Sequence, residues 1–167
     1  MAFDASGVLK LGALSPTKRG VFCHSRGLSP VQDGFLILST EVFHGSRFFI
    51  IAACSAFIAV AAGAFGAHGL RERLDADLLA AFEIGVRYQM YHALALIGVS
   101  WAGTRWPGPF IQAGGWLLVI GSLLFSGSLY LLSLTGTKGL GAMTPVGGML
   151  LLAGWLCLAV GAFQSRK

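Results

Sequence analysis

Long stretches of this chain carry no charged side chain. Asp, Glu, Lys and Arg are all absent from the segment Phe48 to Leu70. Three later intervals are also free of charge: 17 positions after Arg87, 32 after Arg105 and 27 after Lys138. A helix needs roughly 20 apolar residues to cross the hydrocarbon core of a bilayer, whereas a soluble helix carries charges on its outer face. These runs therefore predict an integral membrane protein.

The composition supports this prediction. Of the 167 residues, 55% are hydrophobic and 11% are charged, against about 25% charged in ordinary soluble domains. The formal net charge is +5, and anionic lipid headgroups beside the spans are sufficient partners for it. We therefore expect membrane lipids, and no nucleic acid, as partners.

The apolar segments divide the chain into helices. We expect four membrane spans, at about residues 48–67, 86–104, 110–134 and 144–163. The second span is the least apolar, because its start runs back into a polar-faced helix. Short connections make sequential helices antiparallel neighbours. The predicted fold is all-α, an integral membrane bundle of four antiparallel transmembrane helices.

Residues 1–46 have a different composition, dominated by Gly, Ser, Pro and basic residues, without a periodic apolar face of helical length. This composition predicts a disordered extension before a membrane domain at residues 47–165. Two alternatives stay open. Either the segment is a transit peptide, which its three acidic residues disfavour, or the start is misassigned and the natural chain begins near Val42.

The orientation depends on the basic residues outside the spans. Four spans place both termini on one side of the membrane, and each side has four basic residues close to the spans. Lys18, Arg19 and Arg26 in the N-terminal tail add to the side of the termini. The positive-inside rule then favours cytoplasmic termini in a multi-pass protein of the cytoplasmic membrane.

Four strings occur in order along the chain: GAFGAHGL at Gly63–Leu70, YQMYHALAL at Tyr88–Leu96, FSGSLY at Phe125–Tyr130 and LGAMTPVGG at Leu140–Gly148. Together they resemble the bacterial family called domain of unknown function 423, which is similar to the eukaryotic transmembrane protein 256 family. The resemblance covers about residues 44–163, and the extension before it departs from the family pattern. It implies a small four-span membrane protein whose biochemical role is not established.

Small residues recur at helical spacing in three of the spans. Such residues let helix backbones approach closely in lipid, so the sequence predicts helix-packing positions here. The first span contributes a stripe with a four-residue repeat, and the third and fourth contribute glycines with a seven-residue repeat: Ser55, Ala59, Gly63 and Ala67; Gly114 and Gly121; Gly147, Gly154 and Gly161.

Polar residues gather around the start of the second span. Glu83, Arg87 and Tyr91 are spaced four apart, so on a helix they share one face and the Glu–Arg pair can bond. Tyr88 and His92 are also four apart, on the adjacent face. Ionisable groups at a membrane span are costly and are candidates for function.

Two interpretations of this group stay open. In the first, Arg87 neutralises Glu83, and the tyrosines and histidines lie in the interfacial belt and fix helix orientation. In the second, His68 at the end of the first span joins Glu83 and His92 to line a polar pocket that binds a small ligand, an ion or a proton.

No HExxH, GxSxG, P-loop or CxxC motif occurs in the chain. We therefore expect no catalytic residues, no cofactor and no metal site. The sequence favours a structural or accessory role in the cytoplasmic membrane, with a second copy or another membrane protein as partner. The alternative is a small oligomeric transporter or ligand-binding protein that uses the His68/Glu83/His92 group.

Overall fold

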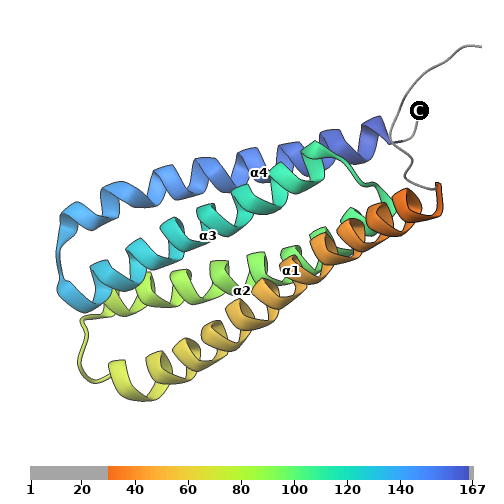
Figure 1. Cartoon of the computed structure of the whole chain (residues 1–167). Coiled ribbons are helices and arrows are strands. Elements are labelled where there is room, and N and C mark those ends of the chain that lie inside the picture. Colours follow the sequence, from red (N-terminus) through yellow and green to blue (C-terminus); the bar gives the residue numbers. More distant parts are fainter. Residues whose placement is uncertain (1–29, 166–167) are drawn as a thin grey trace, which may run out of the picture.

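The computed structural model describes residues 30–165, with side chains from Ser46 onward except that of Lys138. The helical elements are α1 (Pro30–Phe65), a π-helical turn η1 (Gly66–Leu70), α2 (Ala76–Arg105), α3 (Pro109–Thr135), a 3₁₀ turn η2 (Lys138–Met143) and α4 (Thr144–Gln164). The helices follow one another across the molecule in chain order (Figure 1). The described part of the chain is therefore all-helical, as predicted.

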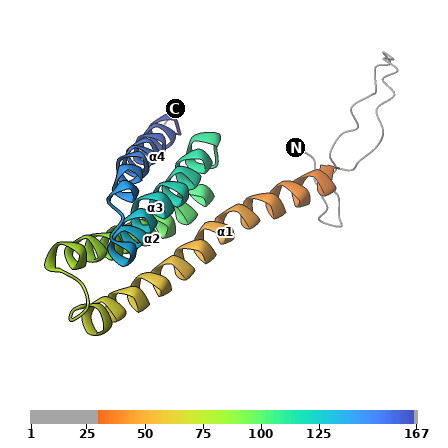
Figure 2. The ribbon, with the colours of Figure 1, turned by 90° about the vertical axis from the view of Figure 1, so that its left-hand side faces the viewer.

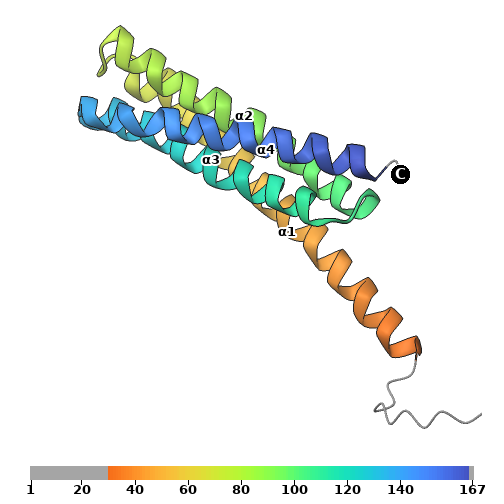
Figure 3. The ribbon, with the colours of Figure 1, turned by 90° about the horizontal axis from the view of Figure 1, so that it is seen from above.

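Each helix packs mainly against its neighbours in sequence: α1 on α2, α2 on α3 and α3 on α4. The turns that join α1 to α2 and α3 to α4 lie at one end of the bundle, and the C-terminal end of α4 lies at the other (Figure 1). Seen from two further directions, α1 extends past the other helices and diverges from them toward its N-terminal end (Figures 2 and 3). The predicted antiparallel four-helix arrangement is confirmed.

Three segments among the described residues are long and apolar enough to cross a membrane: Ser46–Leu70, Pro109–Thr135 and Gly139–Gln164. The remaining helix, α2, has 30 residues and is long enough, at about 1.5 Å per residue. Its hydropathy is lowered by Tyr88, Gln89 and His92. Because α2 lies between α1 and α3, these polar residues can face protein, and the helix completes a four-helix membrane bundle.

The helix boundaries differ from the predicted spans mainly at their starts. α1 begins at Pro30, so helix already precedes the span predicted from residue 48, and α2 begins at Ala76 instead of 86. Hydropathy locates the apolar part of a helix and not its polar continuation. The disorder predicted for residues 1–46 falls on residues 1–29 outside the described part, and residues 30–46 belong to α1.

The ends of α3 follow local backbone rules. Pro109 stands in the first turn, where its fixed φ suits a helix and its missing N–H has no partner to lose. Gly136 ends the helix with φ of 68°, and its N–H bonds to the carbonyl of Leu132. This left-handed cap favours glycine because a Cβ atom would be strained there.

A hydrophobic core joins all four helices. Phe48 and Ala52 of α1 meet Leu96 and Val99 of α2 in this core; α3 and α4 add Ile111, Leu118 and Leu151. A Cβ atom added to Gly115 would lie 2.6 Å from the ring of Phe48. The absence of a side chain at Gly115 is therefore what lets α1 reach α3.

The glycines of the third and fourth spans line the contact between α3 and α4. A Cβ atom on Gly114 would lie 3.0 Å from the carbonyl oxygen of Gly154, and one on Gly154 would lie 3.2 Å from that of Gly114. The other three meet facing residues in the same way: Gly121 against Leu151, Gly147 against Phe125 and Gly161 against Ile111. Backbones that approach this closely need small residues at the contact.

The small-residue stripe of α1 is divided between two environments. Ala59 is fully buried, and a Cβ atom on Gly63 would make an ordinary contact of 3.4 Å with Val86 of α2. Ala67, the last member, is exposed. The stripe therefore faces α2 through its first part but does not pack there at Ala67, because α1 gives way to η1 at Gly66.

Candidate functional site

The polar residues of α2 lie on two opposite faces of the helix. Glu83 and His92 are nine positions apart, which at 3.6 residues per turn is two and a half turns. Accordingly, Glu83 is exposed while His92 is buried, with 6% of its surface exposed. This rotation separates the two residues that the second interpretation of the sequence would place in one pocket.

His92 lies inside the bundle, whereas Tyr88 lies at its edge and is 41% exposed. The His92 Nδ1–H donates to the backbone carbonyl of Tyr88 at 2.7 Å, since a carbonyl oxygen can only accept a hydrogen bond. The Tyr88 ring packs against Phe125 of α3, with ring centroids 4.6 Å apart. Tyr91, one position before His92, is 59% exposed.

Glu83 and Arg87 form the ion pair expected from their spacing. Their closest charged atoms are 4.0 Å apart, and both side chains are more than half exposed. The Arg87 Nε–H also donates to the Glu83 carbonyl at 3.3 Å. The pair lines a hollow of about 350 Å³ together with Gly63, Gly66 and Ala67. An exposed pair of this kind contributes little to stability.

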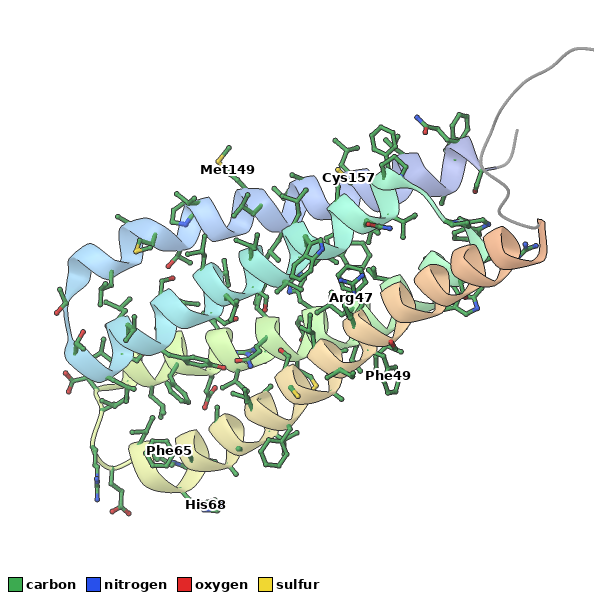
Figure 4. All side chains as sticks on the ribbon, in the orientation of Figure 1. Arg47, Phe49, Phe65, His68, Met149 and Cys157 are labelled. Carbon is green, nitrogen blue, oxygen red and sulfur yellow. The ribbon has the colours of Figure 1, made fainter. Side chains whose placement is uncertain are left out.

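His68 lies apart from these residues. It is in η1, exposed, and points away from α3 and α4 on the outer side of the turn between α1 and α2 (Figure 4). Neither His68 nor His92 lines the hollow beside Glu83. Among the side chains that the structure describes, no three His, Cys, Asp or Glu residues are grouped so that they could hold a metal ion. The structure thus brings Glu83 and Arg87 together, but not the two histidines.

A further polar side chain, one that the sequence pattern did not single out, links three helices. Gln89 donates from Nε2 to the backbone carbonyl of Ser55 at 3.1 Å. Its Oε1 accepts a hydrogen bond from the Tyr130 hydroxyl at 2.8 Å. One amide therefore links α2 to both α1 and α3. The available signal was an uncharged amide inside a predicted span, three positions before His92 on the same helix face.

A second polar link joins α3 to α4. Ser128 Oγ lies 2.8 Å from Thr144 Oγ1 and also donates to the Phe125 carbonyl at 2.9 Å. With the Gln89 link, hydrogen bonds connect all four helices in sequence. In lipid, where apolar surfaces do not drive helices together, such links and close packing hold a bundle.

These features define a small polytopic α-helical membrane protein with polar links between its helices. The chain belongs to the family described as "Protein of unknown function (DUF423)", whose model matches residues 62–148. That range contains all four strings on which the resemblance was based.

Relatives of this chain are UPF0382 membrane proteins. It is 46% identical over 118 residues to one from Staphylococcus saprophyticus, a match that spans 70% of this chain and 97% of the relative. It is 43% identical over 118 residues to YwdK of Bacillus subtilis, covering 70% and 96%. It is 42% identical over 123 residues to the inner membrane protein YgdD of Escherichia coli, covering 73% and 94%. No solved structure matches the chain.

Proposed function

We propose that this protein has a structural or accessory role in the cytoplasmic membrane, exerted through contacts between its outer helices and another membrane protein or a second copy. One observation carries the proposal. Of the apolar membrane-span stretch in α1, and likewise in α4, 17% is buried inside the bundle, whereas 39% of the stretch in α3 is buried. The two outer helices thus leave most of their apolar surface for lipid or for a partner.

Three interior polar groups support a role without catalysis. Gln89, His92 and Ser128 hydrogen-bond to neighbouring helices or to their own helix backbone. Groups held in this way serve the architecture of the bundle. We accordingly propose that the protein is not an enzyme.

The membrane and the orientation form part of the same proposal. The name of the Escherichia coli relative places that protein in the inner membrane, which supports a cytoplasmic-membrane location here, with both termini cytoplasmic. A fluorescent protein fused after the C-terminus should fluoresce, and alkaline phosphatase at that position should be inactive. The opposite result would reverse the orientation.

Cross-linking inside living membranes tests the accessory role. A benzophenone amino acid is placed at Met149 or Leu152 of α4, which are 71% and 73% exposed; Met149 points outward in Figure 4. The same group at Phe57, on the outer surface of α1 and 75% exposed, compares the two faces. Irradiation should give a discrete protein adduct from at least one face. Lipid adducts alone from both faces would refute a role through protein contacts.

A ligand-binding or transport role is the second candidate, and one observation favours it. The hollow of about 350 Å³ between the end of α1 and α2 is lined by the oppositely charged Glu83 and Arg87. Such a pair is suited to a small zwitterion or ion. In this form the candidate no longer includes His68 or His92. Ions and common metabolites are screened for thermal stabilisation of the purified protein. A ligand effect lost in Glu83→Gln supports this role, and its absence across the screen leaves the accessory role preferred.

A further inference from the structure

A second hollow, of about 420 Å³, lies where α1, α2 and α3 meet. Ile50 and Ile58 of α1 and Leu123 of α3 line it, and each of these side chains is more than half exposed on the outer surface. Because this part of α1 and α3 belongs to the membrane spans, the hollow opens sideways toward lipid. Its size falls within the range of small-molecule pockets.

Polar side chains from α2 and α3 form part of the wall of this mostly apolar hollow. Gln89 and Tyr130 line it next to Ser122 and Ser126, which are four positions apart on α3. Ser126 is 2% exposed, and its hydroxyl is a buried group without a hydrogen-bond partner among the described residues. A serine in a span usually bonds a carbonyl one turn earlier. Ser133 on the same helix does so, donating to Leu129 at 2.8 Å.

The unpaired Ser126 hydroxyl has an energetic consequence. A buried donor without an acceptor is unfavourable, and most such groups in proteins are paired. A ligand oxygen that accepts from Ser126 would remove this penalty. The neighbouring amide is already oriented, since Gln89 bonds Ser55 through Nε2 and Tyr130 through Oε1. One N–H of that Nε2 is left as a second donor.

The lining residues also define the charge of the ligand. No Asp, Glu, Lys, Arg or His side chain lines this hollow, and a charged group would be costly there. We propose that the hollow binds an uncharged, largely apolar molecule from the bilayer, with a carbonyl-type oxygen directed at Ser126 and Gln89. The mouth of the hollow includes Ile50 and Ile58 of α1, but the groups that would bind the oxygen, Ser126 and Gln89, belong to α3 and α2. Variants of these groups therefore test the site separately from the outer faces of α1 and α4, on which the accessory role depends.

Thermal unfolding of the purified full-length protein in detergent tests the site. The probes are methyl laurate, which joins an apolar chain to an ester carbonyl, and tridecane, which has a similar chain without oxygen. At about a hundredfold excess over the dissociation constant, a ligand of the folded state raises the melting temperature by the order of 5 °C. Methyl laurate should do so, and tridecane should not.

Two matched serine variants separate binding from folding. Ser126→Ala removes the unpaired hydroxyl, so its melting temperature without ligand should equal or exceed that of the parent, and the methyl laurate shift should be largely lost. Ser133→Ala removes a buried hydroxyl that is paired within its helix and lies away from the hollow, so the shift should persist. An equal shift in Ser126→Ala and the parent, equal effects of ester and alkane, or no shift in the parent would each overturn the proposal.

A lipid ester and a free membrane-dissolved carbonyl compound share this chemistry, and nanodiscs distinguish them. Phosphatidylcholine with ester-linked chains has carbonyl oxygens, whereas its ether-linked analogue does not. If lipid is the source, the protein should be more stable in the ester nanodiscs, and Ser126→Ala should abolish the difference. If a free compound is the source, the two nanodiscs should be equivalent and added methyl laurate should stabilise the protein in both.

Discussion

Removing the Gln89 amide should weaken the contact of α2 with both of its neighbours. Gln89→Met keeps the length of the side chain but loses the bonds to Ser55 and Tyr130. Hydrogen bonds between transmembrane helices contribute about 0.6 kcal/mol on average and about 1.7 kcal/mol at most. The two bonds together therefore predict a loss of about 1.2 to 3.4 kcal/mol in the free energy of unfolding. Tyr130→Phe, which breaks one of them, should lose about half as much.

A double-mutant cycle isolates the bond between the two side chains. The Gln89→Met and Tyr130→Phe proteins and the double variant are unfolded reversibly in mixed micelles by a denaturing detergent. The double variant should be less destabilised than the sum of the single variants, by about 0.6 to 1.7 kcal/mol. Thr104→Ala serves as the control, because the Thr104 hydroxyl is exposed and bonds only its own helix. Effects that add to within about 0.3 kcal/mol would refute the idea that this bond holds α2 to α3.

Three further perturbations follow from the packing. Gly114→Ala should lower the free energy of unfolding by about 1 to 3 kcal/mol, because its Cβ would press on the Gly154 carbonyl. Gly98→Ala, which meets nothing within 4 Å, should be neutral or stabilising. Equal effects of the two variants in denaturation experiments would argue against close packing of α3 on α4. His92→Ala should lower the melting temperature more than His68→Ala, since only His92 is buried, and the reverse order would contradict the observed rotation of α2. Glu83→Gln should change the free energy of unfolding by less than about 1 kcal/mol, because the ion pair is exposed; a larger loss would mean that the pair holds the helices together.

The candidate site was predictable only where its contacts are local. The Glu83–Arg87 pair follows from a spacing of four on one helix, and the structure contains it. A pocket of His68, Glu83 and His92 needs Glu83 and His92 on the same face of α2. Their separation of nine positions is two and a half helical turns, which puts them on opposite faces. Gln89 has partners 34 and 41 positions away. Spacing along α2 gave no indication of either partner.

The sequence by itself determined that this protein folds in a lipid bilayer, and it determined the number of long helices and their antiparallel order. Charge-free runs of about 20 residues are stable as spans only in a bilayer, and short connections leave sequential helices no other neighbours. The close packing of glycines from α3 and α4 at their contact also agrees with their seven-residue spacing.

Only the tertiary structure decided which faces turn inward. It exposed Ala67 and His68, buried His92, joined Gln89 to two helices and left Ser126 unpaired beside a hollow. The physical reason is that lipid is as apolar as a leucine side chain, so hydropathy does not distinguish a face that meets lipid from one that meets protein. In a membrane that choice rests on shape and on a few hydrogen bonds between helices.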